Sequence, residues 1–95
     1  MIISSVVAVT GVPTLLAAAD PKRDFIQVRN ADAGTEIVKL GGVDVAFATG
    51  YGVPPGGTFR LDSTQFSRSS KSDLYAISDG TSVNVEVITG VVPSL

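Results

Sequence analysis

The chain has 95 residues and a net charge of −2, and 44% of its residues are hydrophobic against 17% charged. This composition is typical of one globular domain and excludes a disordered chain. Lysine and arginine are spread singly, except at Lys22-Arg23. Nucleic-acid-binding proteins concentrate positive charge on one face, so we expect no nucleic-acid partner.

The residue types that most often do chemistry are scarce. Histidine, the commonest acid–base catalyst, is absent, and so are cysteine and tryptophan. Most acidic residues fall in or beside turns, where aspartate bonds to local backbone. The loop acids Asp32, Glu36, Asp62 and Asp79 offer oxygen ligands for Ca²⁺, but their spacing matches no calcium-binding loop. We therefore expect a protein that is not an enzyme and holds no metal or other cofactor.

The apolar N-terminus raises the question of a signal peptide or a membrane span. The first 21 residues contain no lysine or arginine, and Thr10 to Pro13 interrupts the apolar run. Both features argue against a signal peptide. No stretch reaches the ~18–20 continuous apolar residues of a membrane span, so we expect no membrane partner. The lack of cysteine fits folding in a reducing cytoplasm. A domain this small without disulfides is expected to gain stability by oligomerising or by attachment to a larger body.

The first third of the chain predicts strands and turns. Ile2 to Val9 is rich in β-branched residues and predicts a strand. Thr14 to Ala19 is too short for a stable helix and predicts an extended segment or a single turn. Asp20 to Arg23 is a proline turn. Phe25 to Asn30 follows as a strand, with Ile26 and Val28 sharing one face.

The middle continues this pattern. Ile37 to Leu40 predicts a strand, followed by Gly41-Gly42 and a further strand over Val43 to Ala48. Thr49 to Gly57 holds too many glycines and prolines for a central strand and predicts a long turn. Thr58 to Asp62 predicts a strand with Phe59 and Leu61 inward. Ser63 to Asp73 is polar and predicts a mobile loop.

The last third predicts a hairpin. Leu74 to Ser78 and Ser82 to Thr89 are joined by Asp79-Gly80-Thr81, a strong hairpin signal. Val91 to Leu95 is an apolar tail. About seven to eight short strands between turns predict one all-β domain over residues 1–95, a compact antiparallel β-sandwich or small barrel. Residues 1–16 are either its first strand or an N-terminal arm.

Four motifs lie along the middle of the chain: A-A-A-D-P-K-R-D-F-I-Q-V-R-N from Ala17, I-V-K-L-G-G from Ile37, P-P-G-G-T-F-R-L-D from Pro54 and L-Y-A-I-S from Leu74. In this order they resemble a small β-module of tailed-phage virion proteins, most closely a capsid decoration (cement) protein. The resemblance implies a structural protein on the outer surface of a phage head that bridges neighbouring capsid subunits. The implied partners are the major capsid protein and copies of itself, with a trimer favoured and a dimer as the alternative.

The same resemblance implies folding in the host cytoplasm and a final location on the capsid surface of the virion. It leaves open a tail, neck or fibre component, including a receptor- or glycan-binding module. The apolar N-terminus either completes the sandwich or adds to a neighbouring subunit's sheet edge. Tyrosine at a loop tip is a favoured contact residue, and apolar tails fray unless docked. The predicted partner-binding residues are Ile2, Ile3, Val6, Val7, Tyr51, Val53, Pro54, Val91, Val92 and Leu95.

Overall fold

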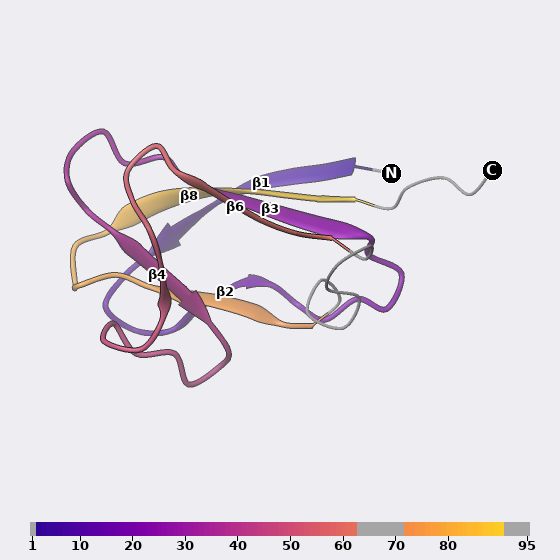
Figure 1. Ribbon diagram of the computed structural model, residues 1–95, viewed down its shortest axis with the longest axis horizontal. Helices are drawn as coiled ribbons and strands as arrows, with labels where there is room; N and C mark the ends of the chain where they lie inside the picture. Colours follow the sequence, from indigo (N-terminus) through magenta and orange to yellow (C-terminus); the bar gives the residue numbers. More distant parts are fainter. Residues whose placement is uncertain (1, 63–71, 91–95) are drawn as a thin grey trace.

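The computed structural model describes residues 2–62 and 72–90, which form two antiparallel four-stranded sheets (Figure 1). Sheet A has the strand order β1-β8-β3-β6, and sheet B has the order β2-β7-β4-β5. The strands are β1 (Ile2–Val9), β2 (Thr14–Ala17), β3 (Phe25–Asn30), β4 (Val38–Gly41), β5 (Tyr51–Val53), β6 (Thr58–Asp62), β7 (Leu74–Ile77) and β8 (Val83–Gly90). The sheets are not closed into a barrel, so the sandwich prediction is confirmed.

Alternating side chains build the core between the two sheets. In β8, Val83, Val85 and Val87 are buried, while Asn84 between them is exposed. In β3, Ile26 and Val28 share one face, as the sequence predicts, and that face is buried. The remaining buried residues of the core come from five other strands: Val9, Leu16, Val38, Leu40, Val53, Leu74 and Ala76. The partly buried Phe59 and Leu61 of β6 pack against them. Burying such a set of branched side chains is the main stabilising term for the sandwich.

The predicted hairpin of β7 and β8 is wrong, because the two strands belong to different sheets. A polar turn connects β7 in sheet B to β8 in sheet A. The hydroxyl of the buried Ser78 donates to the carbonyl of Thr81 at 2.6 Å and accepts the N–H of Gly80 at 3.3 Å. Gly80 has a φ of +123°, which only glycine adopts without strain. Asp-Gly therefore marks a turn here, and the turn joins two layers.

The predicted strand over Val43 to Ala48 is also wrong. These residues form turns that fold back over β4, where Val45 is 7% exposed. A Cβ added to Gly41 would lie 2.8 Å from Cγ2 of Val45, so the turn packs directly on backbone. Val45 thus packs against β4, and the segment forms no strand that pairs with it. Glycine permits the close approach.

The predicted long turn over Thr49 to Gly57 contains a strand, β5. The one glycine of β5, Gly52, is tolerated because the strand is only three residues long and lies at the edge of sheet B. Pro54 follows it at once and ends the pairing. Upstream, Thr14–Ala17 is extended, as one of the two alternatives for that segment predicts. The predicted loop covers Ser63 to Asp73, and its residues 63–71 lie outside the described part of the chain.

A buried arginine ties the turn before β3 to the segment before β7. Arg23 is 3% exposed, and its guanidinium donates to the carbonyls of Ala18 at 2.9 Å and Ser72 at 2.6 Å. Burial lowers the pKa of Arg23, and the nearby carboxylates of Asp20 and Asp73 act in the opposite direction. The motif A-D-P-K-R thus contributes a structural cation that closes one end of the sandwich.

Candidate interaction surface

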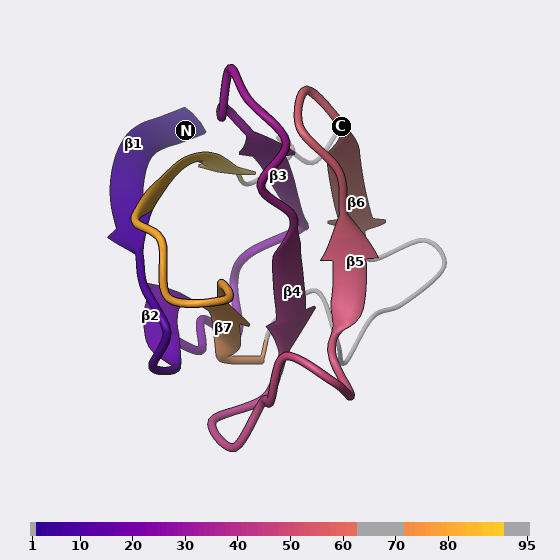
Figure 2. The same cartoon turned by 90° about the vertical axis from the view of Figure 1, so that its left-hand side faces the viewer.

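The N-terminal segment is a strand of the domain's own sheet and lies at its edge. β1 pairs with β8 in an uninterrupted antiparallel register from Ile2 opposite Gly90 to Val9 opposite Val83. Its other side carries no strand in the part of the chain that the structure describes (Figure 2). Every second residue of such a strand points its N–H and C=O groups away from the sheet. Residues 2–9 are therefore the first strand of the sandwich, and the edge of β1 that faces away from β8 carries no strand among the described residues.

Large apolar side chains are exposed along the first five residues of β1. Ile2, Ile3 and Val6 are 71%, 57% and 65% exposed, whereas Val7 is half-buried against the core and Val9 is fully buried. We call Ile2, Ile3, Val6 and the free backbone edge beside them the β1 edge. An exposed, long and apolar edge strand is a template for pairing with another chain.

Alternation places these side chains on both faces of sheet A. Ile2 and Val6 lie on the outer face, while Ile3 lies on the core side. Ile3 remains exposed because sheet B does not fully cover that side: Ile3, Leu16 and Arg23 help to line a cavity of about 220 Å³ there. The β1 edge can therefore be contacted from either face of the sheet.

The outer face of sheet A next to β1 carries paired charges. Arg29 of β3 and Glu86 of β8 form an ion pair at 2.9 Å, with both side chains about half exposed. Farther across, the guanidinium of Arg60 lies 4.4 Å from the centre of the Phe25 ring. Such exposed contacts add little stability. Beside the apolar β1 edge, the charges of Arg29 and Glu86 therefore compensate each other.

A second apolar surface surrounds Tyr51 at the opposite side of the molecule, where β5 and β6 lie (Figure 2). Tyr51 is 62% exposed, and its ring centre lies 4.9 Å from that of Phe59. We call the groove beside these rings the Tyr51 groove. It measures about 420 Å³ and is lined by Leu40, Gly41, Tyr51, Phe59, Arg60, Leu61 and Leu74.

The predicted contact residues around Tyr51 divide into two kinds. Pro54 is exposed, whereas Val53 is 2% exposed and belongs to the core. The prediction for Val53 is wrong, since its side chain is not available to a partner. The glycines and prolines of this segment predict a turn, so the burial of Val53 was not foreseen. In the structure the segment contains β5, whose last residue, Val53, faces the core. Val91, Val92 and Leu95 lie outside the described residues.

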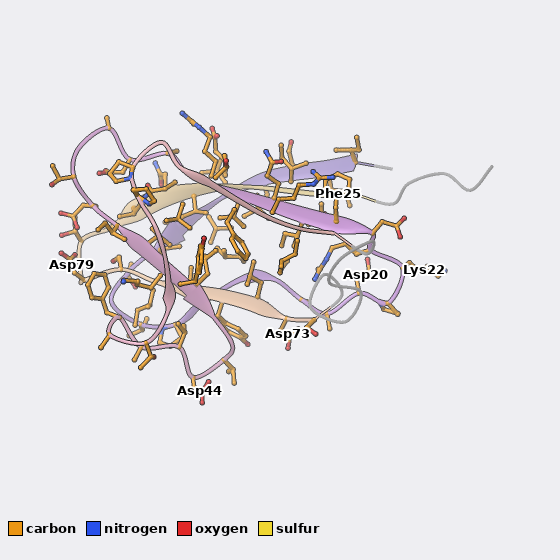
Figure 3. All side chains as sticks on the ribbon, viewed as in Figure 1. Asp20, Lys22, Phe25, Asp44, Asp73 and Asp79 are labelled. Carbon is orange, nitrogen blue, oxygen red and sulfur yellow. The ribbon has the colours of Figure 1, made fainter. Side chains whose placement is uncertain are left out.

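The acidic side chains are spread around the molecule (Figure 3). Asp44, Asp73 and Asp79 lie at separate places on its rim. Asp32 caps its own loop, since its carboxylate accepts the N–H groups of Gly34 at 3.1 Å and Glu36 at 3.0 Å. Within residues 2–62 and 72–90, no three metal-binding side chains are grouped in a way that could hold an ion.

One pair of carboxyl groups was not foreseen, because Glu36 and Asp79 are far apart in the sequence. A hydrogen bond with Asp79, partial desolvation and the negative charges of Asp79 and Asp32 raise the pKa of Glu36. The N–H of Thr81 and the bond with Glu36 lower the pKa of Asp79. Asp79 is exposed and Glu36 is half-buried at the surface, so the pair affects the pH dependence of two loops and forms no enclosed site.

Two apolar surfaces on opposite edges thus stand out, the β1 edge and the Tyr51 groove. No helix among the described residues is long and apolar enough to cross a membrane. Comparison with family models, with curated proteins and with solved structures finds no match for this chain.

Proposed function

We propose that this chain is a structural virion protein, a decoration protein that binds the outer surface of a phage head and bridges neighbouring capsid subunits. The observation that carries the proposal is the pair of apolar surfaces at opposite edges of one small domain. A protein that bridges two bodies needs two separate contact surfaces. Monomeric proteins rarely leave extended apolar surface uncovered, so both surfaces favour a protein that works by contact. The sequence resemblance to virion modules gives the proposal its biological setting.

In this role the protein performs no chemistry. Its partners are the major capsid protein and further copies of the same chain, with the protein folding in the host cytoplasm before it attaches to the head. A single contact through the Tyr51 groove is small, yet several contacts in one closed oligomer multiply through effective concentration. Tyr51 suits such a contact because tyrosine buries much area at a low cost in side-chain entropy.

The test uses heads of the phage that encodes the chain, prepared with its gene deleted. Purified protein is added, unbound protein is removed by sedimentation, and DNA release is followed on heating. We expect saturable binding and DNA retention to higher temperature than in undecorated heads. Tyr51→Lys should weaken binding by at least about tenfold, since it places a charge in an apolar contact. Thr58→Lys, an exposed change on the outer face of β6, is the matched control. Absence of binding, or equal heat resistance with and without the protein, would reject the role.

A second candidate is a receptor- or glycan-binding component of a tail or fibre, and the aromatic lining of the Tyr51 groove favours it. Tyr51 and Phe59 present ring surface beside Arg60, a combination that can stack on a sugar and bond to its hydroxyls. A density map of the intact particle separates the two candidates. Density for this sandwich on the head supports decoration, and density on the tail supports the second candidate.

A further inference from the structure

The two sheets have four edges, and three of them carry features that discourage pairing with another chain. β2 is four residues long and its register shifts between Leu15 and Ala17. β5 is three residues long and is followed by two prolines. β6 carries the exposed, charged side chain of Arg60. Short length, irregular register, proline and charge are the means by which sheet edges are kept free.

The β1 edge has none of these features. β1 is eight residues long, its register with β8 is continuous, and it contains no charged residue, glycine or proline. It also exposes Ile2 and Val6 on one face and Ile3 on the other. A partner that covers all three must be an extended, uncharged strand with apolar or small side chains on both faces.

β1 meets these requirements itself. In an antiparallel pair of identical strands, the numbers of directly opposite residues add up to a constant. A two-fold axis perpendicular to the sheet makes this constant even, so that opposite side chains lie on the same face of the sheet. With the axis at Ser4, Ile2 lies opposite Val6 of the partner subunit on the outer face, and Ser4 lies opposite its own copy. On the other face, Ile3 lies opposite Ser5 of the partner subunit. The pattern Ile-Ile-Ser-Ser-Val is therefore complementary to itself in antiparallel pairing.

We propose that two copies of this chain pair through β1 in antiparallel orientation about a two-fold axis at Ser4. Sheet A then continues across the axis as one eight-stranded sheet. Glu86, which lies opposite Val6 in the β1–β8 register, is already paired with Arg29, so its charge is compensated beside the contact. This contact gives a closed dimer and not the trimer that the resemblance favoured. The inference concerns the free protein and does not rest on the proposed function.

The first test is sedimentation equilibrium of the purified full-length chain. We expect a monomer–dimer equilibrium with a dissociation constant below about 100 µM. Ser4→Lys places two like charges at the axis, on a residue whose side chain is exposed in the monomer. Dimerisation should weaken at least about tenfold. Thr58→Lys makes the same change on the same sheet face at the far edge and should leave the equilibrium unchanged.

The second test exploits the absence of cysteine from the chain. Ser4→Cys should give a disulfide-linked dimer under mild oxidation, because directly opposed residues in an antiparallel pair lie within the Cα separation that a disulfide spans. Thr58→Cys should stay unlinked. Ser4→Lys and Ser4→Asp should form a heterodimer when they are mixed, whereas neither variant alone should form a dimer. The cysteine variant adds no charge, so it keeps the test valid if Ser4→Lys fails to fold.

Specific results would overturn the proposal. These are a wild-type protein that is monomeric at about 100 µM, a trimer, or a dimer that Ser4→Lys and Thr58→Lys affect equally. A wild-type monomer whose binding to heads is lost in Ser4→Lys would show that a capsid strand occupies the β1 edge, which rejects the dimer and retains the decoration role. A dimer that binds no heads would support the pairing through β1 and reject the decoration role.

Discussion

The side-chain amide of Asn30 donates to the carbonyl oxygen of Val53 at 2.9 Å and thereby joins the two sheets. Asn30 is the last residue of β3 in sheet A, and Val53 is the last residue of β5 in sheet B. The same nitrogen donates to the carbonyl of Glu36 at 2.9 Å, and the amide oxygen accepts the N–H of Asp32 at 3.0 Å. Asn30 is fully buried, so these bonds replace water for three backbone groups.

We expect Asn30→Ala to lower the free energy of unfolding by about 3 kcal/mol, because two buried carbonyls and one N–H lose their partner. Urea denaturation followed by circular dichroism measures the change. Asn84→Ala, an exposed position on β8, is the control and should change stability by less than about 0.5 kcal/mol. Equal stabilities for the two variants would mean that the loops re-form their bonds without Asn30.

Arg23→Lys should behave as a disruptive change although the charge is kept. Two carbonyls, of Ala18 and Ser72, receive bonds from different nitrogens of one planar guanidinium, and a lysine ammonium cannot reproduce that geometry in a buried site. We expect a loss of about 1–3 kcal/mol in the free energy of unfolding. Lys22→Arg, at the exposed neighbouring position, should have no measurable effect in the same assay. A stable Arg23→Lys protein would assign the role to burial of the side-chain stem alone.

The sequence predicted strand positions better than strand partners. Alternation in β3, β6 and β8 directly reports which side faces a core, so Ile26, Val28 and Phe59 were placed correctly. Partners depend on whether a turn keeps the chain in one sheet. Among the eight described strands, β4 to β5 alone is such a connection, and every other connection crosses between sheets. Local turn signals do not encode that choice.

The candidate surface was predicted in part. Ile2, Ile3 and Val6 were named from an apolar segment, and the structure exposes all three at a sheet edge. The position of that edge follows from the β1–β8 pairing, a contact between the two ends of the chain that no local pattern reports. The groove beside Tyr51 was missed for the same reason, since β4, β5, β6 and β7 all contribute to its lining.

Gly50 should tolerate no side chain, whereas Gly42 in the same connection should. A Cβ at Gly50 would lie 2.5 Å from the Cβ of Lys39 and 3.1 Å from the carbonyl oxygen of Leu40. The nearest atom to a Cβ at Gly42 is a carboxylate oxygen of Asp44 at 3.7 Å, an ordinary contact. We expect Gly50→Ala to cost about 2 kcal/mol and Gly42→Ala less than about 0.5 kcal/mol. Thermal unfolding of the matched pair measures this, and similar melting temperatures would contradict the close packing of this turn on β4.

The Glu36–Asp79 pair should make stability depend on pH above the ordinary pKa of glutamate. The pKa of Glu36 is raised from its usual 4.5, so the folded state holds its proton more tightly than the unfolded state. The resulting stabilisation is fully present below pH 4.5 and is lost as the pH rises through the raised pKa of the folded protein. Above that point, Glu36 is ionised next to Asp79 and Asp32 and repels both.

Asp79 contributes with the opposite sign. Its pKa is lowered from 3.8, so its stabilisation is present above pH 3.8 and is lost only as the pH falls through the lowered value. The two effects therefore occupy separate pH windows, and above pH 4.5 a variant of Glu36 reports on the upper window.

We expect Glu36→Gln to melt at a higher temperature than the wild type at pH 7, with the difference shrinking as the pH falls towards 4.5. Glutamine keeps an N–H donor for Asp79 and removes the repulsion. Asp44→Asn removes an equal charge from an exposed turn and is the control for net charge. Melting temperatures are compared across pH at low ionic strength, where exposed charges interact most strongly. A constant difference between Glu36→Gln and the wild type from pH 4 to 7, or the same profile for Asp44→Asn, would show that the two carboxyl groups do not share a proton.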